Sequence, residues 1–172
     1  MIKTSNKCLN IKKRNMLLYA HRGLSLSYPE NTLPAIKNTF SYPQIAGCEF
    51  DIQITKDNKI ILLHDNTLDR TSIFSSNITN IPVNKLNIKQ IKQIDVGSWM
   101  NNKFKNIKVP KLGKVMKLLP PNKRYILDIK NINMKTIHLL ETILSKYHFK
   151  CRQIIFLVSD ISLIKYIKKK NA

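Results

Sequence analysis

The stretch MLLYAHRG, residues 16–23, places a histidine, an arginine and a glycine where a short apolar run ends. The run at residues 16–20 has the length and composition of a buried strand. In folds that alternate strands and helices, the residues that carry the chemistry follow the carboxyl ends of such strands. This junction therefore predicts an α/β fold and the edge of the sheet at which a site would lie.

Strand-length apolar runs alternate with segments of helical pattern along the rest of the chain. The expected strands are residues 16–20, 48–54, 60–64, 124–130 and 153–159. The expected helices are residues 32–40, 84–94, 111–119, 134–147 and 161–170. The first helix has Asn31 or Thr32 as its cap and Pro34 in its first turn. This alternation predicts one domain, with a parallel sheet and helices outside it.

One local signal conflicts with an all-parallel sheet. The residues KDNK, 56–59, separate two expected strands and have the composition of a hairpin turn. Parallel neighbours cannot be joined by so short a connection. Either the two strands are antiparallel, or part of residues 52–59 runs back as extended chain. We expect the second arrangement, because the polar residues of both strands then face the same end of the sheet.

Composition bounds the class of protein. The chain has 172 residues, of which 43% are hydrophobic and 23% charged, as in an ordinary globular domain. A net charge of +20 would suit a protein that binds nucleic acid. The lysines, however, are spread over the whole chain, with no arginine-rich cluster, aromatic interleaving or zinc-finger spacing. We therefore expect no specific nucleic-acid partner.

Cysteine usage and hydropathy indicate the compartment. Cys8, Cys48 and Cys151 are odd in number and widely spaced, which favours reduced thiols in a cytoplasmic protein. The longest apolar runs have the length of strands, so no transmembrane segment is expected. Residues 1–15 are basic, without an apolar core of signal-peptide length, and are expected to form a tail before a domain at residues 16–172.

Two acidic residues share one face of an expected strand. In GCEFDIQIT, residues 47–55, Glu49 and Asp51 are two apart, so their carboxylates project from the same face. Phe50 and Ile52 point the other way, into the apolar layer. The two carboxylates repel each other unless a cation or a proton lies between them. A solvent-exposed strand face is one explanation of the pair, and a hard divalent metal is the more economical one.

The strand RYILDIK, residues 124–130, repeats this arrangement with Asp128 and Lys130. The acid would complete an oxygen-ligand set with the first pair, and the lysine would neutralise a bound anion. A plain salt bridge at a strand end is the alternative.

Two histidines end apolar runs in the same manner. His64 follows IILL, just as His21, with Arg22 after it, follows LLYA. Histidines, carboxylates and cations together suit metal-assisted attack on a phosphate ester. In such chemistry the metal and the cations hold the anionic oxygens, and the histidines move protons.

An ordered series of motifs extends over residues 17–160, namely AHRG, PENT, EFDIQITKD, LLHD, LDRT, DVGSW, VPKL and LDIK. This series closely resembles the glycerophosphodiester phosphodiesterase family. The resemblance implies a TIM-barrel scaffold of the (β/α)8 type and a divalent metal, Ca2+ or Mg2+. It also implies a small-molecule partner, a glycerophosphodiester that is hydrolysed to an alcohol and sn-glycerol 3-phosphate.

The resemblance also implies roles for the candidate residues. The implied catalytic residues, which transfer protons, are His21 and His64. The implied phosphate ligands are Arg22 and Lys130. The implied metal ligands are Glu49, Asp51 and Asp128. Gly23 would let the backbone turn beside the phosphate, and the glycerol 2-hydroxyl would serve as the internal nucleophile.

Two features depart from the family pattern. Asp128 stands where the family usually has glutamate. An aspartate at this position resembles the related sphingomyelinase D and phospholipase D-like enzymes, so a lyase of that kind is one alternative. Five strands are fewer than the eight of a closed barrel, so we expect an incomplete barrel from a truncated or split gene product. A remnant that binds glycerophosphates without turnover is another alternative.

The resemblance also implies that residues 66–110 correspond to the family's substrate-side excursion from the barrel.

Overall fold

The computed structural model describes residues 16–73, 78–131, 134–147, 149 and 151–170, so the expected tail at residues 1–15 lies outside the described residues. The strands are β1 (Leu18–Ala20), β2 (Ile45–Ile54), β3 (Ile60–Leu62), β4 (Arg124–Ile129) and β5 (Ile154–Val158). The α-helices are α1 (Leu33–Thr39), α2 (Ile88–Ile91), α3 (Leu112–Met116), α4 (Met134–Lys146) and α5 (Ile161–Lys170). The short 3-10 helices are η1 (Asp69–Thr71), η2 (Val83–Lys85), η3 (Asn102–Phe104) and η4 (Cys151–Gln153).

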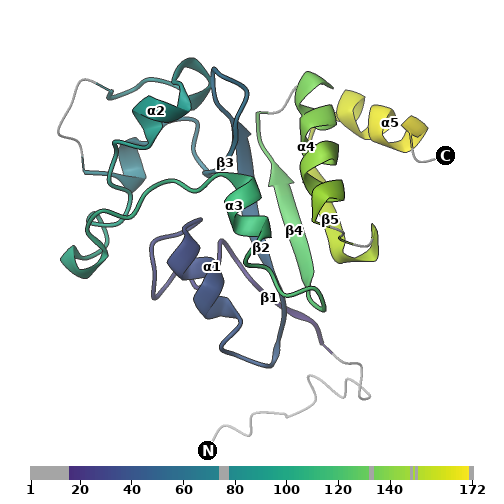
Figure 1. Ribbon diagram of the computed structural model, residues 1–172, viewed down its shortest axis with the longest axis horizontal. Coiled ribbons are helices and arrows are strands. Elements are labelled where there is room, and N and C mark those ends of the chain that lie inside the picture. The colour runs from purple at the N-terminus through teal and green to yellow at the C-terminus, as the bar shows by residue number, and fades with distance from the viewer. Residues whose placement is uncertain (1–15, 74–77, 132–133, 148, 150, 171–172) are drawn as a thin grey trace, which may run out of the picture.

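The sheet confirms the predicted α/β class. β1, β2, β4 and β5 are neighbours in that order and run parallel, and helices connect them (Figure 1). Each expected strand is present, with ends that differ by a few residues. The helix expected at residues 84–94 is reduced to η2 and the single turn of α2. Thr32 is the N-cap of α1 and accepts a hydrogen bond from Ala35 N, and Pro34 lies in the first turn.

β3 is antiparallel to β2, so the expectation that residues 52–59 run back as extended chain is wrong. A tight turn joins the two strands, in which Thr55 N donates to Lys59 O and Asn58 N donates to Thr55 O, each at 3.0 Å. Asn58 adopts a φ of 56°, a left-handed conformation that asparagine tolerates better than most residues. β2 is ten residues long and extends past β1, which leaves its edge free for this hairpin.

β1 and β3 occupy the same edge of β2 and approach each other end to end. Ala20, the last residue of β1, is the register partner of Cys48, and Leu62, the last of β3, is the partner of Ile52. The two strands run in opposite directions, so both of their carboxyl ends point toward residues 49–51 of β2. The hairpin therefore brings the segments that carry the two candidate histidines to one place, as expected, although by a different route.

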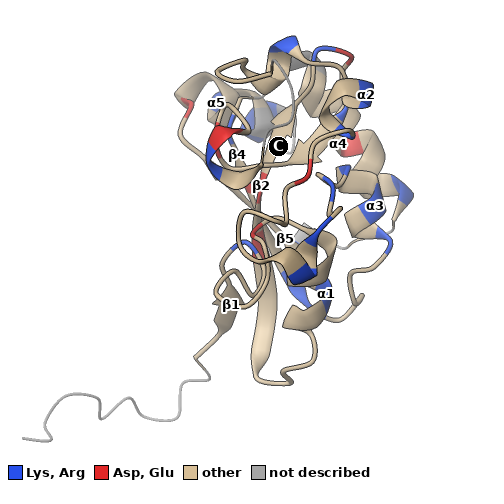
Figure 2. Ribbon diagram, turned by 90° about the vertical axis from the view of Figure 1, so that its left-hand side faces the viewer, with Lys and Arg blue, Asp and Glu red and all other residues tan. Residues whose placement is uncertain are grey.

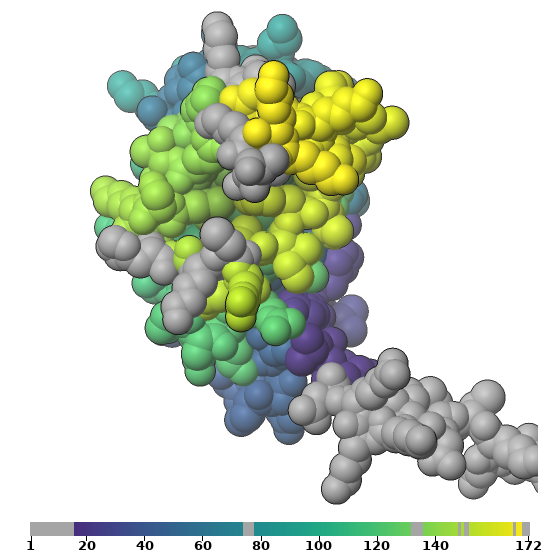
Figure 3. Space-filling model, turned by 90° about the vertical axis from the view of Figure 1, so that its right-hand side faces the viewer, coloured from purple at the N-terminus to yellow at the C-terminus, as the bar shows by residue number. Residues whose placement is uncertain are grey.

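The helices cover one face of the sheet. Phe50 and Ile52 of β2 and Leu127 of β4 are buried against apolar residues of α1, α3, α4 and α5, which confirms the predicted apolar layer. Figure 3 shows α4, β5 and α5 side by side on one side of the molecule. On the opposite face of the sheet, Ile155 and Leu157 of β5 are 40% and 46% exposed.

The segment at residues 66–110 has a small core of its own. Ile61 and Leu63 alternate with the residues that β3 gives to the main core, and they are buried in this second cluster. The other buried members of the cluster are Leu68, Val83, Leu86, Ile91, Ile94, Val96 and Val109. The segment is thereby packed on the side of β3 that faces away from the helices of the main core.

The basic residues are spread over the molecule, whereas some of the acidic residues gather on one strand. Figure 2 shows Lys and Arg on many helices and loops, whereas Asp and Glu include residues along β2. Within the described residues, no helix combines the length and the apolar character needed to cross a membrane.

Candidate active site

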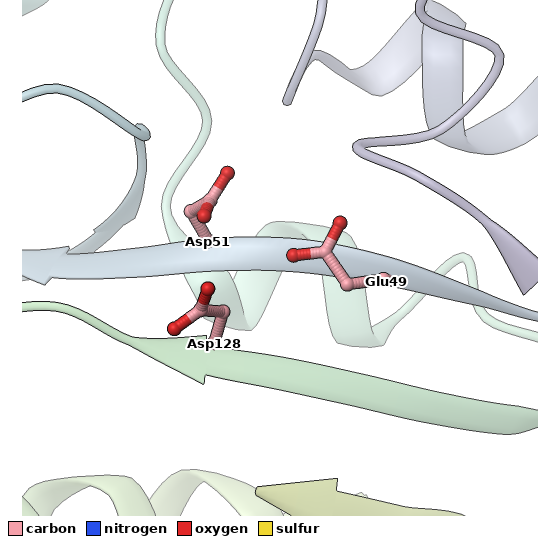
Figure 4. A group of neighbouring side chains, drawn as sticks. All are labelled: Glu49, Asp51 and Asp128. Carbon is pink, nitrogen blue, oxygen red and sulfur yellow. The ribbon is translucent and has the colours of Figure 1, made fainter. Parts of the chain in front are cut away.

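Three carboxylates converge on the face of the sheet opposite the helices of the main core. Glu49 and Asp51 project from the same face of β2, and Asp128, the register partner of Asp51, lies beside them on β4 (Figure 4). One oxygen from each lies within 4.8 Å of the others. Glu49 and Asp51 are buried, and the side chain of Asp128 is 26% exposed. The structure thus brings together all three acids that the sequence predicted as metal ligands.

The electrostatics of this cluster fit a divalent cation. Burial, followed by the negative charge of Asp51, raises the pKa of Glu49 to about 7. Carboxylates this close to one another resist ionisation unless a positive charge joins them. Their hard oxygen donors are those that Ca2+ and Mg2+ prefer. The residues present therefore suit such an ion in both charge and donor type.

Lys130 lies at the edge of the acid cluster. Its Nζ is 2.6 Å from Oδ2 of Asp128 and 3.2 Å from Oδ1 of Asp51. Burial would lower the pKa of Lys130, but its hydrogen bonds to the two carboxylates outweigh that effect and raise it. The lysine is therefore held as a cation beside the carboxylates.

Arg22 contacts the cluster from the opposite side. Its backbone N donates to Oε2 of Glu49 at 2.9 Å, and its Nε lies 3.2 Å from Oδ2 of Asp51. Arg22 has a φ of 57°, and Gly23 follows it with a φ of 79°. A Cβ at Gly23 would lie 2.6 Å from the backbone carbon of Ala35, so only glycine fits this turn.

Asn31 fixes the orientation of Asp51. Its Nδ2 donates to Oδ2 of Asp51 at 2.8 Å, and its Oδ1 accepts from Asp51 N at 3.1 Å. The backbone N of Asn31 donates to the carbonyl oxygen of Arg22 at 3.0 Å. The PENT motif, residues 29–32, thus reaches the carboxylates directly.

His21 and His64 flank the cluster in different environments. The Nε2 of His21 lies 3.9 Å from Oε2 of Glu49, and its side chain is 69% exposed. The Nδ1 of His64 lies 2.5 Å from Oδ1 of Asp65, and its side chain is 34% exposed. His64 is thus fixed by an adjacent carboxylate, whereas His21 is open to solvent.

A chain of ion pairs joins the two flanks. Nη1 of Arg22 lies 3.0 Å from Oε1 of Glu30, and Arg70 donates to both oxygens of the same carboxylate at 2.8 and 3.0 Å. The Nε of Arg70 also donates to Oδ2 of Asp65 at 2.6 Å. Burial alone would raise the pKa of Glu30, but its two arginine partners lower it. Glu30 and Arg70 therefore connect Arg22 with the carboxylate that orients His64.

Gln53 holds the segment that carries His64. Its amide nitrogen lies 3.1 Å from the carbonyl oxygen of Leu63, 3.0 Å from that of His64 and 2.6 Å from that of Asp65. Sequence reasoning gave Gln53 no role, although it continues the i, i+2 spacing of Glu49 and Asp51 on the same strand face. That spacing was the signal that would have found it.

Comparison with known proteins identifies the family. The chain matches the glycerophosphoryl diester phosphodiesterase family over residues 21–172, and it belongs to this family. The expected family is therefore confirmed.

Individual relatives agree with this assignment. A glycerophosphodiester phosphodiesterase of Caldanaerobacter subterraneus subsp. tengcongensis is 34% identical over 103 residues, which are 60% of this chain and 40% of that protein. A Bacillus subtilis enzyme of the same name is 31% identical over 67% of this chain and 40% of its own length. The chain thus spans about 40% of the length of these curated relatives.

Solved structures show the same fold. The glycerophosphodiester phosphodiesterase of Agrobacterium tumefaciens superposes with a TM-score of 0.77 at 21% identity, over 90% of this chain and 62% of that one. A phosphodiesterase of Oleispira antarctica, solved in complex with the product sn-glycerol-3-phosphate, gives a TM-score of 0.76 at 23% identity over the same shares. The five-stranded sheet therefore corresponds to part of the TIM-barrel fold of this family, as expected.

Proposed function

We propose that this chain is a metal-dependent phosphodiesterase that hydrolyses glycerophosphodiesters to an alcohol and sn-glycerol 3-phosphate. The observation that carries the proposal is the convergence of Glu49, Asp51 and Asp128 between the two segments that bear histidines. Membership of the family and the relative solved with sn-glycerol-3-phosphate support the substrate class. A role in lipid and glycerol phosphate metabolism and a cytoplasmic location are part of the same proposal.

The three carboxylates would hold Ca2+ or Mg2+. Such an ion supplies Lewis-acid stabilisation of the phosphate oxygens when it is bound. The residues of the chain set its position, because Asn31 fixes Asp51 through two hydrogen bonds and Arg22 N fixes Glu49 through one.

Arg22 and Lys130 would hold the phosphate from two sides. Both cations lie within 3.2 Å of Asp51, so an anionic ester placed at the acid cluster lies between them. Their charges would stabilise the negative charge that develops on the oxygens of the pentacoordinate phosphate, and this effect is larger there than in bulk water because the site is partly buried.

His21 and His64 would transfer the protons. One histidine takes the proton of the glycerol 2-hydroxyl as its oxygen attacks phosphorus, and the other protonates the departing alcohol. Water then opens the cyclic phosphate with the two roles reversed, which yields sn-glycerol 3-phosphate. Either histidine can take either role in this scheme.

Phosphorus NMR of the products tests this function. The purified chain with Ca2+ or Mg2+ should convert glycerophosphocholine into sn-glycerol 3-phosphate. The variants His21→Ala and His64→Ala should lose at least about a hundredfold in rate. His138→Ala, on α4, is the matched control and should turn over like the wild type.

Other outcomes of this experiment decide between the alternatives. A cyclic phosphate that accumulates as the final product indicates a lyase of the sphingomyelinase D type. Binding of glycerophosphates without any product indicates a chain that retains the site but not the reaction. Equal rates in the wild type and both histidine variants contradict the assignment of the histidines.

A further inference from the structure

A polar cavity of about 500 Å3 lies beside the candidate active site, where β2, β4 and β5 end. Lys130 forms part of its wall, and Nζ of this lysine contacts both Asp128 and Asp51 of the acid cluster. The cavity and the acid cluster are thus adjacent through one side chain. A molecule bound at the carboxylates has this cavity next to it.

The outer wall of the cavity is built from two segments that are fastened together. The hairpin turn between β2 and β3 contributes Lys56, and η2 contributes Lys85. Lys56 N donates to Leu86 O at 2.9 Å, and Ile88 N donates to Oδ1 of Asp57 at 2.9 Å. These bonds fix the two lysine-bearing backbones beside each other, so the wall does not depend on a chance approach of two loops.

The charge of the wall is positive. Among the residues that the structure describes, it carries Lys56, Lys85 and Lys130 but only one acid, Asp160, whose Oδ1 accepts the hydrogen bond of Ser162 N at 2.7 Å as the cap of α5. Lys130 is already paired with the acid cluster. Within the described ranges, Lys56 and Lys85 take part in no ion pair.

The remaining lining indicates what the cavity would accept. It includes the amides of Asn58, Asn84 and Asn131, which offer donors to an anion, and its described residues include no aromatic side chain. Two ammonium groups with neighbouring amides suit the oxygens of a phosphate. A quaternary ammonium group is recognised through aromatic rings, and the part of the lining that the structure describes offers it none.

We propose that this cavity receives the alcohol part of the substrate and selects diesters whose alcohol carries a second phosphate group. The inference rests on the proposed function, because it names a substrate class for the same site. One phosphate lies at the acid cluster with Arg22 and Lys130, and the second lies between Lys56 and Lys85. A glycerol linker separates the two phosphates by only a few bonds in bis(glycerophospho)glycerol, which makes that compound the natural probe.

A comparison of three substrates provides the test. They are bis(glycerophospho)glycerol, with a second phosphate, glycerophosphoglycerol, with a neutral alcohol, and glycerophosphocholine, with a cationic one. The wild type should give the highest kcat/KM with bis(glycerophospho)glycerol, about tenfold above that with glycerophosphocholine. The reason is that the other two substrates lack the second phosphate and therefore its charge-assisted contacts with Lys56 and Lys85. The difference should lie mainly in KM and should shrink as the ionic strength rises.

A matched pair of variants separates the cavity from general charge. Lys56→Gln with Lys85→Gln removes two positive charges from the wall, and Lys114→Gln with Lys117→Gln removes two exposed charges on and just after α3. The first double variant should lower the preference for bis(glycerophospho)glycerol over glycerophosphocholine about tenfold. The second should keep the preference of the wild type. An equal effect of both double variants, or a wild type that prefers glycerophosphocholine, overturns the proposal.

Calorimetric binding keeps this inference distinct from the proposed function. The same ligands are titrated into His64→Ala, which retains both lysines. The proposal is supported if this variant binds bis(glycerophospho)glycerol more tightly than glycerophosphocholine, and if Lys56→Gln and Lys85→Gln in the same protein abolish the difference. This holds even if the wild type hydrolyses neither compound. Equal binding of the two ligands overturns it even if hydrolysis is observed.

Discussion

Asp65 holds the imidazole of His64, with 2.5 Å between Oδ1 of the acid and Nδ1 of the ring. A carboxylate on Nδ1 fixes the tautomer and the orientation of a histidine, and it leaves Nε2 for proton transfer. The other oxygen of Asp65 accepts from Nε of Arg70 at 2.6 Å, which fixes the carboxylate in turn. The ring that we propose as a proton carrier is therefore oriented by two further residues.

Asp65→Asn tests the orientation of the ring. The amide still fills the space but no longer compels Nδ1 to carry the proton, so we expect kcat to fall by about a hundredfold while KM changes little. Steady-state kinetics with glycerophosphocholine provide the measurement. Asp69→Asn, a nearby acid at the start of η1, is the matched control. A kcat like that of the wild type in Asp65→Asn would mean that the pair has no part in the reaction.

Arg70→Ala tests the link between the two flanks of the site. Arg70 binds the carboxylates of Glu30 and Asp65 together, so its loss should free both and lower kcat/KM by about tenfold. Its side chain is 47% exposed, so the unfolding temperature should change by only a few degrees. Arg70→Lys should restore part of the activity, and Arg152→Ala on η4 should resemble the wild type. If Arg70→Ala and Arg152→Ala behave alike, the link is not functional.

Local pattern was sufficient for much of this site. The alternation of Glu49 and Asp51 with Phe50 and Ile52 follows from the two-residue period of a strand, and the buried apolar layer on the other side confirms it. Asp128 joins the first pair because parallel strands with the same pattern lie in register. These relationships depend on strand geometry alone, so the sequence predicts them.

Contacts between distant segments were not predictable in the same way. Arg70 meets Glu30 across 40 positions of the chain, and neither residue carries a local signal for the other. The antiparallel β3 was misjudged because the free edge of β2 depends on the length of β1, which ends early. The Arg70–Glu30 contact and the pairing of β3 with β2 both depend on tertiary structure, which a local sequence pattern does not encode.

The pH dependence of metal binding follows from Glu49. Burial and the charge of Asp51 raise its pKa to about 7, and an ion must displace this proton below that pH. The affinity for Ca2+ should rise by up to about tenfold per pH unit toward pH 7 and then level off. Calorimetric titrations across this range provide the measurement. An affinity that does not change with pH would show that Glu49 carries no proton for the ion to displace.

The stability of the metal-free chain should fall as pH rises, whereas the affinity for Ca2+ rises. Folding raises the pKa of Glu49 from its ordinary 4.5 to about 7, so its ionisation destabilises the fold as pH increases through this range. Glu49→Gln, whose side chain has nearly the shape of the protonated acid and no charge, should raise the melting temperature at pH 8 and leave it unchanged near pH 4. A rise of the same size at both pH values would point to packing as its cause.

Asp128 tests whether the shorter acid is a ligand. Asp128→Asn should weaken Ca2+ binding by about tenfold or more, because one of three charged donors is lost. Asp128→Glu keeps the donor and should stay within about threefold of the wild type. Calorimetry on both variants decides the point. Equal affinities in the wild type and Asp128→Asn would leave only Glu49 and Asp51 as ligands.

The most direct measurement follows turnover and stability in one Ca2+ titration. Release of sn-glycerol 3-phosphate and the melting temperature are recorded for the same preparation at each Ca2+ concentration. If one site on Glu49, Asp51 and Asp128 serves both, the two curves should share a midpoint, and Asp51→Asn should abolish both responses. Turnover that persists in a chelator, or that survives Asp51→Asn, would contradict the assignment of a catalytic metal to these carboxylates.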